Sequence, residues 1–325
     1  MRRRSVLIIT AASAAAAGAL MLRNPQPGVG SGPAVGIQPA AAATVTLPVK
    51  AEHPATLSGR RYPLIPESAA ETAALLVAVE IALRDPATPP DELPELGHQQ
   101  QVIYRVLSAD PGRADPVVAL LPPRWRSVAQ RHLAARREFL RMSRGRGPST
   151  LPAWRIIQPE PAEQLLSHYR KAEAATGIEW EVLAAVNLVE TGMGRIDGVS
   201  VANAQGPMQF LPTTWAEAGI GKGDIRNPED AIQAAARYLV RRGGLKDIRR
   251  GLWGYNNSDY YGRAVLLYAS LMKEDPRAYY GLYHWEIHFN ANAGDLWLPV
   301  GYSQLRSIDV QDYLRTNPSS RSPNR

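Results

Sequence analysis

Apolar side chains recur at the helical period through most of this chain of 325 residues. Between residues 67 and 84 they fall on one helical face, at Leu75, Leu76, Val79 and Leu83. The same period predicts helices over 99–107 and 125–142, and it returns from residue 161 to 273. A more extended apolar pattern follows over 279–300 and favours a segment that packs back on the helices. The pattern as a whole predicts an all-α fold.

The N-terminus has the layout of a secretory signal peptide. Arg2, Arg3 and Arg4 precede an uncharged run rich in Ala, Leu and Ile that ends near Leu22. This run is also just long enough to remain as an uncleaved membrane anchor. We therefore expect residues 1–23 to be a signal peptide or an anchor, and the protein to lie outside the cytoplasm in the cell envelope, either secreted or anchored.

Shifts in composition divide the rest of the chain. Residues 24–59 are rich in Pro, Gly, Ala and Thr, which predicts a disordered tether. A smaller helical accessory domain is expected over 60–146 and a Pro-punctuated linker over 147–160. The main helical domain, with its C-terminal extended segment, is expected over 161–316. A polar tail over 317–325 is predicted to be disordered.

Charge and cysteine content exclude some classes of function. The chain has no cysteine, so it has neither a disulfide nor a thiol nucleophile. Its formal charge of +7 suits a polyanionic partner, and the helix over 125–142 is rich in arginine. That helix either grips an anionic wall or membrane or presents a solvated face, and the solvated face is favoured. Export argues against nucleic acid, and a cytosolic location would revive a nucleic-acid-binding protein.

The helix predicted over 177–190 is strongly apolar and ends in an acid, Glu190. Leu183 and Val186 lie on the same helical face as Glu190, so its carboxyl points toward the apolar side. Burial disfavours the charged form and should raise the pKa of this carboxyl, as a general acid requires. Gly192 and Gly194 then stop the helix and open a turn. A surface ion pair with Arg195 is the alternative for an isolated glutamate.

Two further motifs follow in order. The first is a small-residue loop that contains Ser200 and runs into Gly206-Pro207-Met208-Gln209, and the second is Gly254-Tyr255-Asn256. With the helix that ends at Glu190, they make the sequence resemble the lytic murein transglycosylases of the soluble type, which belong to the lysozyme-like superfamily. The resemblance covers about 162–273. Thr191, Pro207 and Gly254 depart from the family's usual Ser, Leu and Ala.

The resemblance implies a lysozyme-like catalytic domain that cleaves the β-1,4 bond between N-acetylmuramic acid and N-acetylglucosamine in peptidoglycan. It implies that Glu190 is the catalytic acid and base, that the product is a 1,6-anhydro sugar, and that the activity serves cell-wall remodelling. The residues implied to bind the glycan strand are Thr191, Ser200, Gln209, Tyr255 and Asn256. Amide and hydroxyl groups suit sugar hydroxyls and the N-acetyl group, although Gln209 and Asn256 are also suited to anchoring loops.

Most glycosidases use two carboxylates, and the sequence provides poor candidates for the second. Glu229 and Asp230 are typical of the first turn of a helix, which leaves Asp197. A single acid fits the anhydro-forming reaction. A hydrolytic muramidase and a non-catalytic peptidoglycan-binding protein of the same fold remain alternatives. His284 and His288 are interpreted as structural, and neither a metal site nor a cofactor is expected.

Overall fold

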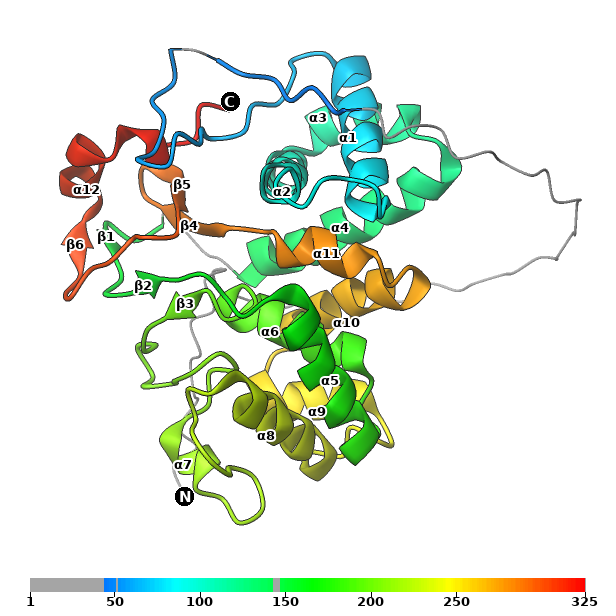
Figure 1. Cartoon of the computed structure of the whole chain (residues 1–325), viewed down its shortest axis with the longest axis vertical. Helices are drawn as coiled ribbons and strands as arrows, with labels where there is room; N and C mark the ends of the chain where they lie inside the picture. Colours follow the sequence, from blue (N-terminus) through cyan, green and yellow to red (C-terminus); the bar gives the residue numbers. More distant parts are fainter. Residues whose placement is uncertain (1–43, 51, 143–146, 325) are drawn as a thin grey trace, which may run out of the picture.

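The computed structural model describes residues 44–50, 52–142 and 147–324 (Figure 1). The signal peptide or anchor predicted for residues 1–23 lies outside this range, as does most of the predicted tether. The part of the tether that is described, residues 44–50 and 52–59, contains no helix or strand. No helix within the described ranges is long and apolar enough to cross a membrane.

Helices dominate the described residues, which confirms the predicted all-α class. The N-terminal helices are α1 (Ala69–Arg84), α2 (Leu93–Ala109), α3 (Pro111–Leu120) and α4 (Pro123–Met142). The central helices are α5 (Ala162–Thr176), α6 (Trp180–Thr191), α7 (Pro212–Trp215), α8 (Pro228–Arg241), α9 (Ile248–Asn256) and α10 (Asp259–Glu274). The C-terminal helices are α11 (Ala278–Tyr283), α12 (Val310–Thr316) and the short 3₁₀ turn η1 (Pro318–Ser320).

The strands of the described chain form three two-stranded antiparallel sheets. The pairs are β1 (Thr150–Leu151) with β6 (Ile308–Asp309), β2 (Arg155–Ile156) with β3 (Ile196–Asp197), and β4 (Ile287–Ala291) with β5 (Gly294–Leu298). The last pair is a hairpin in which Ile287 lies opposite Leu298. Its apolar side chains pack in a small second core with Leu151, Trp154 and Tyr302.

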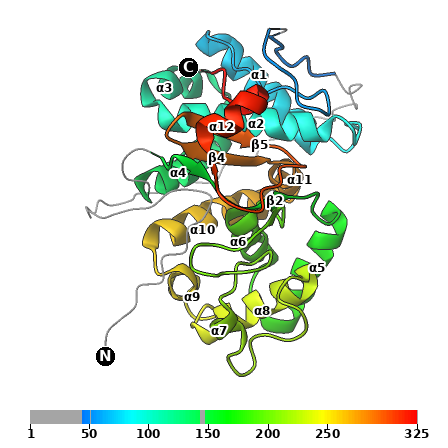
Figure 2. The same ribbon diagram turned by 90° about the vertical axis from the view of Figure 1, so that its left-hand side faces the viewer.

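The helix α10 lies at the centre of the fold. Figures 1 and 2 show it between α1–α4 on one side and α5, α8 and α9 on the other. It packs most extensively on α4 and α6. One continuous hydrophobic core includes residues from α1–α4 and from the central helices. At the same junction Arg263 of α10 donates hydrogen bonds of 2.8 and 3.0 Å to Glu138 of α4. The accessory helices are therefore packed into the body of the protein.

Most of the predicted helices are present, with small shifts at their ends. The helix α3 was not predicted, since it is short and contains Pro116. Asp110 begins it by accepting a hydrogen bond from the backbone N–H of Arg113. The extended pattern over 279–300 is wrong for its first residues, which form α11. There the spacing of Tyr279, Leu282 and Tyr283 lets a helix bury all three side chains.

The predicted linker and tail are more ordered than expected. Residues 147–160 contain β1 and β2, and the backbone N–H of Ile156 donates to the carbonyl of Tyr302. The prediction of disorder from residue 317 is corrected for 317–324. Asn324 donates to the carbonyl of Pro63 and accepts from the backbone N–H of Ile65. Backbone and amide hydrogen bonds hold this polar segment, and a composition argument does not detect them.

The shared core leads to a prediction about unfolding. Leu133 of α4 is buried in that core, so Leu133→Ala should lower the free energy of unfolding by about 2–5 kcal/mol. Leu120→Ala is the control, because Leu120 is exposed and should change stability by no more than about 0.5 kcal/mol. Urea titration followed by tryptophan fluorescence and far-ultraviolet circular dichroism should give one coincident transition. Two separate transitions would contradict a shared core.

Candidate active site

Glu190 sits in the last turn of α6, the most deeply buried helix of the central group. Apolar residues surround this helix on all sides, so a polar group near its end is taken into the core with it. Only 3% of Glu190 is exposed. Its Oε1 accepts a hydrogen bond of 2.7 Å from the hydroxyl of Tyr261. Its Oε2 has no hydrogen-bond partner among the described residues.

This environment keeps the carboxyl of Glu190 mostly protonated near neutral pH. Burial raises the pKa of its carboxyl to about 8, against the smaller opposite effect of the Tyr261 hydrogen bond. The alternative of an ion pair with Arg195 is not found: Arg195 donates to the carbonyl of Gly192 and lies over the ring of Tyr283. Within the described ranges, Glu190 takes part in no ion pair.

The turn after Glu190 has an unusual backbone that the two glycines permit. Gly192, Met193 and Gly194 all have positive φ, at 60°, 64° and 89°. Gly192 closes α6 in the left-handed conformation, and a Cβ there would come within 2.6 Å of Ile287. The predicted stop of the helix is confirmed. The helix end is consequently held against the β4–β5 hairpin at a defined position.

The hydroxyl of Thr191 supports this turn from inside the protein. It donates to the carbonyl of Pro207 at 2.6 Å and accepts from the backbone N–H of Gly194 at 3.0 Å. Asn187 donates to the same carbonyl at 2.8 Å. Thr191 is fully buried, so the structure differs from the prediction that it contacts a glycan. It ties the end of α6 to the loop of residues 206–209.

Gln209, Tyr255 and Asn256 come together as predicted. They line one cavity of about 310 Å³ with Phe210, Tyr238 and Trp253. The hydroxyl of Tyr255 donates to the carbonyl of Met208, which joins α9 to the 206–209 loop. The Nδ2 of Asn256 is buried and has no partner among the described residues. This cavity therefore combines aromatic walls with amide side chains, and one amide nitrogen next to it lacks a partner.

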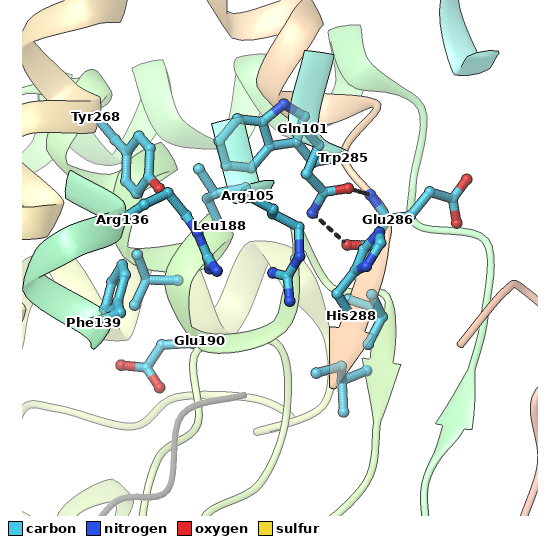
Figure 3. Close-up of a pocket in the computed structure, with 14 residues that line it drawn as sticks. Gln101, Arg105, Arg136, Phe139, Leu188, Glu190, Tyr268, Trp285, Glu286 and His288 are labelled. Atoms are coloured by element: carbon cyan, nitrogen blue, oxygen red, sulfur yellow. Dashed lines mark hydrogen bonds between the residues drawn. The ribbon is translucent and has the colours of Figure 1, made fainter. Parts of the chain in front are cut away.

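Glu190 lines a different cavity, although only two rings separate it from the first. The rings of Tyr255 and Tyr261 are parallel within 4°, with centroids 6.4 Å apart. The cavity of Glu190 is about 80 Å³ and is also lined by Arg105 and Arg136 (Figure 3). Sequence analysis did not select either arginine or Tyr261. Tyr261 is placed by Ser258, whose hydroxyl accepts from its backbone N–H and begins α10, and this cap is visible in the sequence.

The remaining predicted residues stand apart from these cavities. The hydroxyl of Ser200 accepts from the backbone N–H groups of Ala202 and Ala204, so it stabilises its own loop. Asp197, the sequence candidate for a second carboxylate, forms ion pairs with Arg155 and Arg226.

One carboxylate that sequence analysis missed, Glu286, also lines the cavity of Glu190. Its Oε1 accepts from Arg60 at 2.6 Å, and in Figure 3 its carboxylate points away from Glu190. Glu286 is thus neutralised by an internal partner. It does not stand opposite Glu190 in the manner of a second catalytic acid.

A helical domain with a buried, singly placed glutamate beside a sugar-sized cavity is the arrangement of a lysozyme-like protein. A family model described as the transglycosylase SLT domain matches residues 167–260, which include Glu190, Gln209 and Tyr255. Over these residues the chain is therefore similar to the SLT domain.

The chain is also similar to a membrane-bound lytic murein transglycosylase F from Thiobacillus denitrificans, with 25% identity over 146 residues. This similarity covers 45% of the chain and 30% of the relative. The chain therefore matches less than a third of that relative's length. No solved structure is significantly similar to the chain.

The raised pKa of Glu190 predicts a pH-dependent stability. The folded state binds this proton with a pKa of about 8, against 4.5 as the ordinary value. The stabilisation is therefore fully present below about pH 4.5 and is lost as the pH rises through about 8. Glu190→Gln has no such proton. Thermal melts should show wild type losing stability relative to Glu190→Gln across this interval, by about 1.4 kcal/mol per pKa unit at most. Parallel pH curves would contradict the buried carboxyl.

Proposed function

We propose that this protein is a lytic transglycosylase that cleaves the β-1,4 bond between N-acetylmuramic acid and N-acetylglucosamine in peptidoglycan and forms a 1,6-anhydro product. The observation that carries the proposal is the buried carboxyl of Glu190, whose pKa is raised to about 8 with no acidic partner facing it. The match to the SLT domain and the relative's name support it. The proposed role is cell-wall remodelling.

In the proposed reaction, protonated Glu190 donates its proton to the glycosidic oxygen as the bond from that oxygen to C1 breaks. The carbonyl oxygen of the substrate's own N-acetyl group bonds to C1 and compensates the positive charge. Ionised Glu190 then removes the proton of the C6 hydroxyl, whose oxygen attacks C1 and displaces the N-acetyl oxygen. Glu190 ends in its protonated form, and no water is consumed.

Burial suits Glu190 to both steps. A carboxyl with a pKa of about 8 is mostly protonated at neutral pH, so it can donate first. Once ionised in an apolar site it is a stronger base than an exposed glutamate and recovers a proton readily. The hydrogen bond from Tyr261 holds Oε1 in place, which leaves Oε2 to carry the transferred proton.

The cavity of Gln209, Tyr255 and Asn256 is the proposed binding site for the N-acetylated sugar. The unpaired Nδ2 of Asn256 is suited to donate to an N-acetyl carbonyl, and the aromatic walls are suited to the apolar face of a sugar ring. Ser200 is proposed to contact the strand from its own loop. Thr191 is proposed to act indirectly, by holding the 206–209 loop that carries Gln209.

Because peptidoglycan is the proposed partner, the proposed location of the protein is the cell envelope. The N-terminal arginines and apolar run support export, with residues 1–23 either cleaved or kept as an anchor. Both outcomes bring the protein to the wall.

The product distinguishes the proposed reaction from its rivals. Mass spectrometry of digested peptidoglycan should show anhydro-muramyl ends, one water lighter than hydrolytic products. Glu190→Gln should abolish their formation, because it removes the transferred proton, while Glu179→Gln at the exposed start of the same helix should not. Reducing muramic acid ends would indicate a muramidase. Binding without any cleavage by wild type would indicate a non-catalytic protein.

The pH profile tests the acid role of Glu190 directly. Since cleavage needs the protonated carboxyl, kcat/KM should fall as the pH rises through about 8. Tyr261→Phe removes the hydrogen bond that lowers the pKa of Glu190, so this fall should move to higher pH by about one unit. Tyr260→Phe serves as the neighbouring control, because Tyr260 packs on Arg263 instead. An unshifted profile in Tyr261→Phe would refute this assignment.

A further inference from the structure

Arg136 of α4 is a buried cation that has no ion-pair partner among the described residues. Only 8% of the residue is exposed, and its Nε has no hydrogen-bond partner among the described residues. No ion pair in the described part of the chain includes it. By contrast, Arg141 on the same helix is exposed and forms an ion pair with Glu138.

A second arginine lies beside Arg136 and has its own partner. Arg105 of α2 forms an ion pair with Asp295, and it also donates to Asn290 at 3.3 Å. Asp295 is fully engaged, since it also accepts from Tyr62 at 2.6 Å and contacts His288 at 2.9 Å. Asp295 is therefore the single carboxylate near the two guanidinium groups: it pairs directly with Arg105 and acts on Arg136 only at longer range.

The other titratable groups near the pair do not supply the missing negative charge. His98 and His288 are in contact, Nε2 to Nε2 at 3.0 Å, and burial lowers the pKa of both imidazoles, which keeps them neutral at neutral pH. Glu286 is paired with Arg60. Burial, together with the charge of Arg105, lowers the pKa of Arg136 to about 10, against the opposite effects of Tyr268, Asp295 and Tyr62, and Arg136 stays protonated.

The two arginines stand where two cavities meet. Both line the cavity that contains Glu190, and both line a groove of about 1240 Å³ between α2, α4, the β4–β5 hairpin and the C-terminal segment. In Figure 3 the guanidinium groups of Arg105 and Arg136 both point toward the side of the pocket on which Glu190 lies. Neither contributes to the pKa shift of Glu190, so they are not its internal partners.

An uncompensated buried charge lowers the stability of a folded protein, so its presence beside a reactive group indicates a ligand of opposite charge. A guanidinium group matches a carboxylate through two parallel hydrogen bonds. Peptidoglycan strands carry carboxylates on the lactyl group of stem-free muramic acid and on the peptide stems. The groove is large enough to hold a peptide stem that leaves the glycan near Glu190.

We propose that Arg136, supported by Arg105, binds a carboxylate of the peptidoglycan strand and thereby positions that strand against Glu190. This inference rests on the proposed function. It assigns to the accessory helices α2 and α4 a part of the substrate site that lies outside the matched SLT domain.

Binding measurements test the proposal in a chain that cannot consume its ligand. All variants are made in a Glu190→Gln background, called the carrier, which cannot cleave glycan. Calorimetry then measures its affinity for a tetrasaccharide of N-acetylglucosamine, for stem-free glycan fragments and for peptide-bearing fragments. Adding Arg136→Gln should weaken the binding of an anionic ligand at least about tenfold, or about 1.4 kcal/mol, and leave the affinity for the uncharged tetrasaccharide unchanged. Arg141→Gln is the matched control and should change none of the three affinities.

The pattern of loss identifies which carboxylate is bound. Weaker binding of peptide-bearing fragments alone indicates the stem, and weaker binding of stem-free fragments indicates the lactyl group. Unchanged affinities for both anionic ligands, or an equal loss for the tetrasaccharide, would overturn the proposal. Failure of the carrier to bind any of the three would refute the proposed function itself.

Thermal stability separates a binding role from a structural one. Because an unpaired buried charge is unfavourable without its ligand, Arg136→Met should raise the melting temperature of the free protein. If Arg136 served packing alone, its replacement would lower the melting temperature of the free protein. If Arg136→Gln does not fold, Arg136→Lys keeps the charge without the two-pronged geometry and should still weaken the anionic ligands. Full affinity in Arg136→Lys would then overturn the bidentate carboxylate site.

Discussion

The burial of one carboxyl group is the constraint on which the rest of the site depends. Glu190 is taken into the core because α6 is buried over most of its length, and this burial raises the pKa of its carboxyl to about 8. No nearby negative charge is needed to produce the shift. The acid is therefore created by the same packing that stabilises the helix, and a change that let water reach Oε2 would remove its ability to donate a proton at neutral pH.

Burial alone does not determine where the carboxyl of Glu190 lies. The turns around it fix its position. The left-handed residues after Thr191 stop α6 immediately beyond the acid. The hydroxyl of Thr191 and the amide of Asn187 then share the carbonyl of Pro207, so hydrogen bonds join the helix end to the loop that carries Gln209. Tyr261 completes the arrangement from α10, and its ring lies parallel to that of Tyr255. The acid and the sugar-sized cavity are thus connected through a chain of short contacts.

Sequence analysis predicted the parts of this site that depend on local signals. The apolar helix, its glycine stop and the two later motifs identified Glu190, Gln209, Tyr255 and Asn256, and the structure brings the last three together. It missed Tyr261 and Arg136, because their relation to Glu190 depends on how α10 packs on α6 and on α4, and no short-range pattern encodes such packing. The order of the C-terminal segment was not predicted for a related reason. Its hydrogen bonds reach Pro63 and Ile65, more than 250 residues away in sequence.

The arginine-rich helix shows why composition alone misjudged the accessory region. Counted along the sequence, its arginines favour a solvated face, and for Arg124 and Arg141 this is where they lie. Arg136 belongs to the same series but faces inward, since α4 packs on α10 along its length. Tyr261, which contacts Glu190, lies on α10. The same helix packs on α4, whose Arg136 lines the same cavity as Glu190. The accessory helices and the helices of the region that matches the SLT domain therefore share a core, and that core sets the position of Arg136 relative to Glu190. A strand carrying both a glycosidic bond and a carboxylate is the kind of molecule that such a fixed pair is suited to bind.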